Sequence, residues 1–136
     1  IKVSELDTDY VSFLKRFVAL GKIRKMKLRV LVDIMYGAGN SFIENVLKPS
    51  GIKINYLHSG FNPSFGGIHP EPIDNNLGEL IRRVKREKYD LGIALDGDAD
   101  RIAMVTGKGE FINAQVLLPM LAIHMIKNRK EPSGIG

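Results

Sequence analysis

The chain has 136 residues, of which 44% are apolar and 26% are charged, and it contains no cysteine. This composition predicts one folded domain with its own core and excludes disulfides, thiolate zinc sites and a cysteine nucleophile. The first residues lack the apolar core of a signal peptide. The longest apolar stretch, Val116 to Ile126, is about half as long as a membrane span and contains Pro119. We therefore expect a cytoplasmic protein with no membrane partner.

The net charge is +5, and the basic residues gather in three clusters. Such clusters can meet nucleic acid or an anionic substrate. No aromatic residues alternate with them for base stacking, and they fall at the predicted ends and exposed faces of helices, where basic residues are common. We therefore expect no nucleic-acid partner. The clusters are Lys22, Arg24, Lys25, Lys27 and Arg29; Arg82, Arg83, Lys85, Arg86 and Lys88; and Lys127, Arg129 and Lys130.

Hydrophobic periodicity and turn residues predict alternating strands and helices. Residues 58–73 contain three prolines and three glycines, so this long segment is predicted to be a loop, and loops of this length are often functional. The predicted elements are a helix from Asp9 to Gly21, strands at 28–34 and 52–57 around a turn at 36–40 and a helix at 42–47, a helix from Asp74, strands at 91–95 and 102–106, a turn at 107–109 with a short piece at 110–112, and a helix at 113–128.

This order predicts an α/β fold, a three-layer α/β/α sandwich with a mostly parallel four-stranded sheet and an antiparallel edge hairpin. We expect one domain over residues 1–136, with a structured core at about 9–130. Residues 1–8 and 131–136 have the character of linkers.

The most informative segment is a run of alternating aspartates directly after the predicted strand 91–95. Asp96, Asp98 and Asp100 are separated by the small residues Gly97 and Ala99, which let the backbone curl so that the side chains converge. Ligands of open α/β sheets bind at the carboxyl ends of the strands. Clustered carboxylates repel one another unless a cation lies between them, and an oxygen-only set with few protein ligands favours Mg²⁺.

Arg101 follows the last aspartate and is suited to grip a phosphate oxygen while the metal takes another. Three alternatives remain beside the magnesium site. One is a solvated acidic turn without a ligand. The second is an EF-hand calcium loop, but Arg101 stands where that pattern requires glycine, and Gly107 stands where it requires glutamate. The third is a haloacid-type phosphatase, whose nucleophile and position in the domain match poorly.

The segment DGDADR after LGIAL, followed by IAMVTGKGEFI, resembles the metal-binding loop of the α-D-phosphohexomutases, the phosphoglucomutase and phosphomannomutase family. Two upstream segments resemble that family in the same order. VLVDIMYGAGN is similar to the first strand and turn of its second domain, and NPSFGGIHPEPIDNNLGEL is similar to its proline-rich loop and the following helix.

The resemblance implies a four-domain enzyme in which a phosphoserine of the first domain exchanges its phosphoryl group with a phosphosugar through a bisphosphate. It implies Asp96, Asp98 and Asp100 as Mg²⁺ ligands and Arg101 as a catalytic contact to the phosphoserine. The other mutase domains and the phosphosugar would be the partners. This sequence contains no TASHNP-like serine loop and no RPSGTEP-like phosphate loop. We therefore expect the isolated chain to be inactive. The sequence does not identify which hexose phosphate is the substrate.

Other candidates have weaker signals. Gly37 and Gly39 open a helix after a strand, which is compatible with a phosphate cradle but more typical of an ordinary turn. His69 and Lys108 are weak candidates for substrate binding, and His69 is equally suited to hold the proline-rich loop.

Two other functions stay open from the sequence. The first is a non-catalytic α/β module that binds an anionic ligand or a partner protein. The second is another Mg²⁺-dependent phosphotransfer enzyme whose nucleophile lies within this chain.

Overall fold

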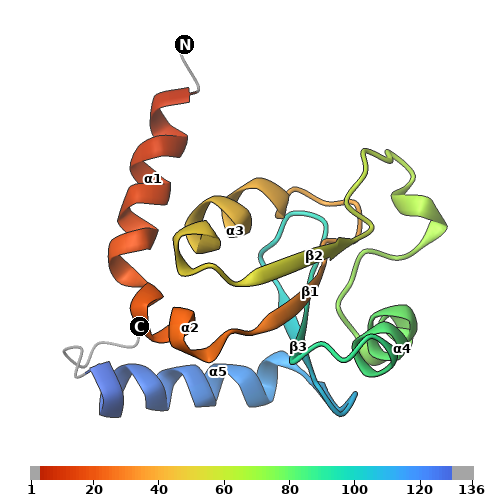
Figure 1. Ribbon diagram of the computed structural model, residues 1–136. Coiled ribbons are helices and arrows are strands. Elements are labelled where there is room, and N and C mark those ends of the chain that lie inside the picture. The colour runs from red at the N-terminus through yellow and green to blue at the C-terminus, as the bar shows by residue number, and fades with distance from the viewer. Residues whose placement is uncertain (1–3, 130–136) are drawn as a thin grey trace.

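The computed structural model describes residues 4–129 (Figure 1). Its centre is a five-stranded sheet in the order β2-β1-β3-β4-β5. Strand β1 runs parallel to both β2 and β3, whereas β3 with β4 and β4 with β5 are antiparallel pairs. The strands are β1 (Arg29–Asp33), β2 (Lys53–Leu57), β3 (Leu91–Leu95), β4 (Ile102–Thr106) and β5 (Phe111–Ile112).

The α/β fold with its antiparallel edge is therefore confirmed, but the sheet is mixed, with two parallel and two antiparallel strand pairs, instead of mostly parallel, and it has one strand more than predicted. The connection from β3 to β4 is the short aspartate loop, residues 96–101. A parallel neighbour needs a crossover of a dozen or more residues, so a loop of this length forces β4 to run antiparallel. The expected short piece after the 107–109 turn pairs with β4 as the two-residue strand β5.

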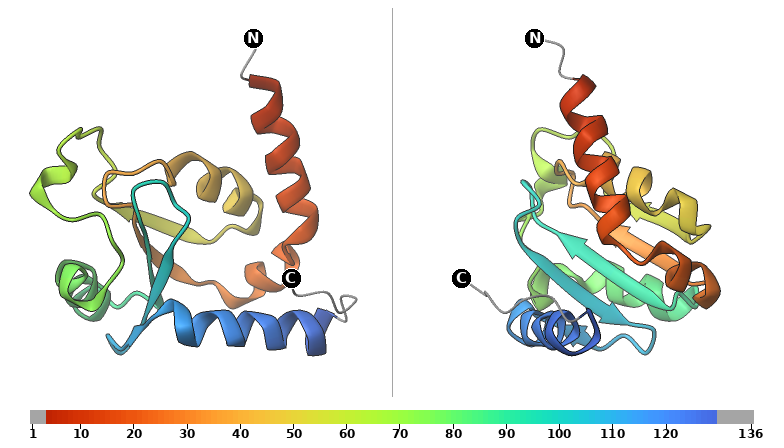
Figure 2. Two further views of the ribbon diagram at one scale, coloured as in Figure 1. Left: turned by 180° about the vertical axis from the view of Figure 1, so that it is seen from behind. Right: turned by 90° about the vertical axis from the view of Figure 1, so that its left-hand side faces the viewer.

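The helices follow the predicted alternation. Figures 1 and 2 show α1 beside α3, and α4 separate from both across the sheet. The helices are α1 (Ser4–Phe17), α2 (Leu20–Met26), α3 (Asn40–Leu47), α4 (Gly78–Arg86) and α5 (Ala114–Ile123), with the π-helical segment η4 (His124–Arg129) after α5 and short 3₁₀ turns η1 (Lys48–Ser50), η2 (Phe65–Gly67) and η3 (Asp74–Asn76).

The start of the chain differs from expectation. Helix α1 begins at Ser4, so residues 4–8 are helical and not a linker. The Ser-Glu pair at residues 4 and 5 is typical of a helix start, and neither proline nor glycine interrupts the segment that follows. Helix α1 ends at Phe17, and α2 is a separate helix that contains Gly21. Residues 131–136, the other expected linker, lie outside the described residues.

The core has one cluster on each face of the sheet. On one face, Leu80 and Val84 of α4 are fully buried and pack against strand residues such as Leu31, Ala94 and Val105. On the other, Val30, Val32, Ile34 and Leu95 pack with Ile43 of α3. Helix α1 joins this second layer through an edge-to-face contact between Tyr10 and Phe42, with ring centroids 5.6 Å apart. The two layers hold the strand ends, and therefore the aspartate loop, in place.

Helix α5 begins at a side-chain cap. The Oδ1 of Asn113 accepts a hydrogen bond from the Val116 backbone N–H at 3.1 Å, which satisfies one of the free donors of the first turn. Pro119 lies inside this helix. Among residues 4–129, no helix has both the length and the apolar character needed to cross a membrane.

The end of α4 gives a pH prediction. Arg83 donates two hydrogen bonds to the Glu87 carboxylate, at 2.7 and 3.2 Å, and these bonds, with a further one from Arg86, lower the pKa of Glu87 from 4.5 to about 2. A lowered folded-state pKa adds stability above pH 4.5 that is lost as the pH falls toward 2.

We therefore expect Glu87→Gln to lower the free energy of unfolding at pH 7. The difference from wild type should shrink between pH 4.5 and about 2, where the wild-type carboxylate takes up its proton. Urea unfolding of both chains across this range measures it. A difference that stays constant down to pH 2 would show that the Arg83 contact does not stabilise the ionised form.

Candidate metal centre

The aspartate loop lies at the carboxyl end of β3. Because β1 and β2 run parallel to β3, their last residues, Asp33 and Leu57, end at the same edge of the sheet. This is the edge at which ligands of open α/β sheets bind. The fold therefore places the loop where the sequence predicted a site.

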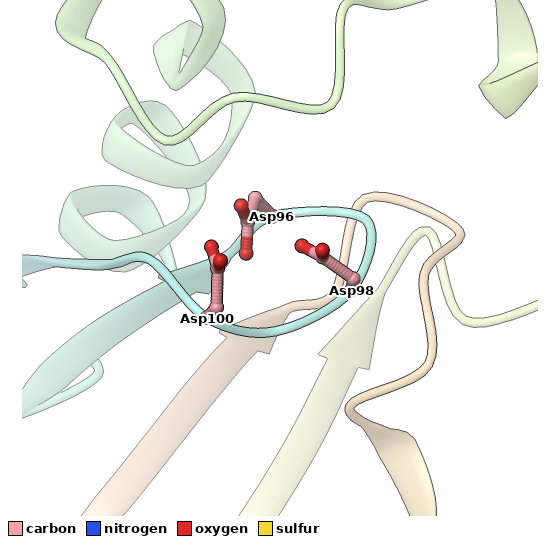
Figure 3. A group of neighbouring side chains, drawn as sticks. All are labelled: Asp96, Asp98 and Asp100. Atoms are coloured by element: carbon pink, nitrogen blue, oxygen red, sulfur yellow. The ribbon is translucent and has the colours of Figure 1, made fainter.

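The three predicted metal ligands come together. One carboxylate oxygen from each of Asp96, Asp98 and Asp100 lies within 4.8 Å of the others. Figure 3 shows the carboxylates facing one another across the curve of the loop. Asp96 is completely buried, whereas Asp98 and Asp100 are exposed. The carboxylate cluster is thus buried at Asp96 and open to solvent at Asp98 and Asp100.

The local backbone produces this convergence. The Ala99 N–H donates to the Asp96 carbonyl at 3.2 Å, and Ala99 has a left-handed φ of 65°. The Asp96 N–H donates in turn to the Arg101 carbonyl at 3.3 Å, next to the first pair of the β3–β4 ladder. The tight turn between the antiparallel strands β3 and β4 therefore directs the three alternate side chains toward one another.

The carboxylates differ in their electrostatics. Burial opposes ionisation of Asp96, but hydrogen bonds from the backbone and guanidinium of Arg101 outweigh it and lower the pKa of Asp96. The pKa of Asp100 is raised, first by its hydrogen bond to Asp96 and then by the nearby charge of Asp98. Ionising all three groups together is therefore unfavourable without a positive charge between them.

Arg101 supplies part of that positive charge and organises the loop. Its backbone N–H donates to Asp96 Oδ1 at 3.0 Å, and its Nε donates to Asp96 Oδ2 at 2.7 Å. Its Nη1 donates to Glu71 Oε1 at 2.6 Å. The side chain nevertheless remains 55% exposed, so its outer edge is accessible to an anion. Arg101 therefore connects the aspartate loop to the 58–73 loop while presenting charge to solvent.

The turn between β1 and α3 contacts the aspartate loop directly. The Ala38 N–H donates to the Gly97 carbonyl at 3.0 Å. A Cβ on Gly37 would lie only 2.5 Å from that same carbonyl oxygen, so the close approach requires glycine. The Gly37 turn thus packs directly on the aspartate loop, and the amides of Gly37 and Ala38 both donate to protein carbonyls, those of Ile34 and Gly97.

The proline-rich loop covers the opposite side of Gly97. A Cβ on Gly97 would meet the Phe65 ring at 3.3 Å and Pro70 at 3.6 Å. Glu71 follows Pro70 and reaches Arg101. The long loop predicted from its prolines and glycines is therefore part of the site wall.

The two weak candidates for substrate binding, His69 and Lys108, lie in different parts of the structure. His69 is 76% exposed, with its Nδ1 3.8 Å from Glu71 Oε2, so it lies beside the loop that reaches Arg101. Lys108 lies in the β4–β5 turn. Because Thr106 pairs with Leu91 at the start of β3, this turn is at the end of the sheet opposite the aspartates. The structure does not bring Lys108 to the aspartate loop.

Sequence reasoning missed two participants, Asp33 and His58, and underrated a third, Glu71, which it allows as a partner beside the metal site but finds more typical of a surface charge. Glu71 has the sequence context of a surface charge, yet it bonds to Arg101. Asp33 and His58 attracted no role, yet their side chains meet at 2.9 Å at the same sheet edge. For Asp33 a signal existed, because an acid that ends a buried strand needs a partner. For His58 none did, because its partner is distant in sequence, and for Glu71 the only signal is its place in the proline-rich loop.

The residues fit a hard divalent cation. Three oxygen ligands, one of them buried and fixed by Arg101, leave positions for water or a phosphate oxygen, as Mg²⁺ prefers. The set contains no nitrogen or sulfur ligand for a softer metal.

Comparison with known proteins agrees with this arrangement. Residues 8–109 match the family model described as phosphoglucomutase/phosphomannomutase, alpha/beta/alpha domain II. A protein of Methanococcoides burtonii named "Probable phosphoglucosamine mutase" is 38% identical over 77% of this chain and 24% of its own length. The Pseudomonas syringae pv. tomato phosphomannomutase/phosphoglucomutase is 34% identical over 74% of this chain and 22% of its own.

A Thermococcus kodakarensis phosphopentomutase is 32% identical over 87% of this chain and 25% of its own length. A solved Thermus thermophilus structure, described as a "putative phosphomannomutase", superposes with a TM-score of 0.82 at 32% identity, over 95% of this chain and 30% of that one. The chain thus spans about a quarter of the curated relatives that it matches. It belongs to the phosphoglucomutase/phosphomannomutase family and corresponds to the family's second, α/β/α domain.

Proposed function

We propose that this chain is the Mg²⁺-binding domain of a phosphohexomutase, which moves phosphate between two positions of a hexose phosphate. The observation that carries the proposal is the convergence of Asp96, Asp98 and Asp100 at the ligand-binding edge of the sheet. Family membership supports the reaction class. A non-catalytic module gives no reason for three facing carboxylates held by an arginine.

Within this proposal the residues have distinct roles. The aspartates are metal ligands and stay ionised, so none is proposed as a general base. When bound, Mg²⁺ would neutralise charge on the transferring phosphoryl group. Arg101 fixes Asp96 and presents its exposed edge to a phosphoryl oxygen. The charge and positioning needed for phosphoryl transfer are thus collected on one loop.

The nucleophile is proposed to lie outside this chain. The sequence holds no TASHNP-like serine loop, and the aspartates are proposed as metal ligands. We therefore propose that the isolated chain does not turn over substrate and that the other mutase domains complete the site. The relatives are named for glucosamine, glucose, mannose and pentose phosphates, so the sugar stays open within sugar phosphates.

The test is an assay of the complete protein that carries this chain, with glucose, mannose and glucosamine 1-phosphates supplied separately with Mg²⁺. We expect conversion of at least one to its 6-phosphate, no conversion by residues 1–136 alone, and loss of turnover in Asp98→Asn. Asp74→Asn, an exposed aspartate outside the loop, is the matched control and should stay active. Robust turnover by the isolated chain, or an active Asp98→Asn protein, would overturn the proposal.

A further inference from the structure

A second polar cluster lies at the end of β1, at the same edge of the sheet as the aspartate loop. The side chain of Asp33 is only 1% exposed. Its Oδ1 accepts a hydrogen bond from the Met35 backbone N–H at 2.9 Å and lies 2.9 Å from His58 Nδ1. Because a carboxylate oxygen accepts, His58 donates through Nδ1. Burying a carboxylate costs free energy unless it is hydrogen-bonded, so the fold depends on these two contacts.

These contacts hold an unusual stretch of backbone. Met35 and Tyr36 both have left-handed φ angles, 45° and 60°, which residues with side chains adopt rarely. Asp33 bonds the Met35 N–H, and the His58 carbonyl accepts from the Tyr36 N–H at 2.7 Å. The Tyr36 and His58 rings lie with centroids 5.1 Å apart. Asp33 and His58 together therefore fix both left-handed residues.

The fixed turn leads directly to the metal loop. Ala38, two residues after Tyr36, donates its N–H to the Gly97 carbonyl at 3.0 Å. Gly97 lies between the proposed ligands Asp96 and Asp98, and a Cβ added at Gly37 would lie 2.5 Å from the Gly97 carbonyl oxygen and 2.9 Å from the Asp96 carbonyl oxygen, so the turn lies directly against the loop. A path of direct contacts thus runs from Asp33 and His58 through the turn to the two ligands.

We propose that Asp33 and His58 are positioning residues for the metal site: by fixing the Met35–Ala38 turn, they hold Gly97 and thereby the spacing of Asp96 and Asp98. The inference rests on the proposed Mg²⁺ function for its consequence, but its structural part stands without metal. The Nε2 of His58 lies 3.7 Å from Oε2 of Glu79, an exposed residue of α4, which is beyond hydrogen-bond distance.

Two readouts on the 136-residue chain test this. The first is hydrogen exchange of the Ala38 amide in metal-free protein, and the second is Mn²⁺ affinity measured by EPR. Asp33→Ala removes both contacts, and we expect Ala38 to exchange about tenfold faster. Mn²⁺ should bind about tenfold more weakly, as is common when groups that orient metal ligands are removed. Asp33→Asn keeps an acceptor oxygen and should restore both values to near wild type.

His58→Phe provides an independent variant, because it retains a ring beside Tyr36 but removes the Nδ1 donor. It should change both readouts in the same direction as Asp33→Ala. Leu117→Ala, in the buried face of α5, is the control for general destabilisation and should leave Mn²⁺ affinity unchanged.

Ala38 exchange and Mn²⁺ affinity that stay at wild-type values in Asp33→Ala and His58→Phe would overturn this inference. Faster Ala38 exchange in the two variants, together with no Mn²⁺ binding by the wild-type chain, would contradict the proposed function instead.

Discussion

Replacement of Asp98 by asparagine is expected to weaken Mn²⁺ and Mg²⁺ binding by at least about tenfold, because losing even groups that only orient metal ligands costs about 10- to 100-fold. Asp98 is exposed and lies in the open side of the loop, so its replacement removes a ligand without opening the core. It also removes one of the charges that raise the pKa of Asp100. The free energy of unfolding in the absence of metal should therefore stay the same or rise slightly.

Isothermal titration with Mn²⁺ measures the affinity, and urea unfolding in EDTA measures the metal-free stability. Asp74→Asn, which changes the net charge equally, should bind as wild type does. Equal affinities for the Asp98→Asn and Asp74→Asn chains would mean that Asp98 is not a ligand and that the loop is an acidic turn.

Replacement of Gly37 by alanine is expected to have the largest effect on both stability and the site. The added Cβ would lie 2.5 Å from the Gly97 carbonyl oxygen and 2.8 Å from the Gly97 Cα, both backbone atoms that cannot rotate away. Overpacking of this kind costs about 1–3 kcal/mol. Because the clash of the added Cβ with Gly97 is relieved only by moving the turn or the aspartate loop, Mn²⁺ affinity should fall as well.

Gly60→Ala is the matched control, because a Cβ at Gly60 meets no atom within 4 Å and its φ is not in the left-handed region. It should leave both the unfolding midpoint in urea and the Mn²⁺ affinity close to wild type. A Gly37→Ala chain that matches Gly60→Ala in both measurements would show that the turn does not pack on the loop in solution.

The sequence predicted the elements whose signals are local. Strands β3 and β4 lie where their apolar runs placed them, at Leu91–Leu95 and Ile102–Thr106. The aspartates converge because alternate residues of a tight connection between two paired strands share one side. In these segments propensity, pattern and tertiary structure agree, so local reasoning was sufficient.

The differences arise where tertiary contacts decide. The sequence predicts a helix that ends at Gly21, but the break falls at Val18 and Ala19, and Gly21 continues as part of α2. The Arg101–Glu71 and Asp33–His58 contacts join residues 30 and 25 positions apart. No periodicity encodes such pairs, because they depend on how the loops at one sheet edge fold over one another.

Amide NMR of the isolated chain during a Mn²⁺ titration tests the central claim, that the aspartate loop binds a divalent metal, most directly. We expect selective broadening of the amides of residues 96–101, with the neighbouring Gly37 and Ala38 affected next, and reversal by excess Mg²⁺. Broadening spread evenly over exposed carboxylates, or none at the loop at millimolar Mn²⁺, would contradict the assignment of Asp96, Asp98 and Asp100 as metal ligands of this domain.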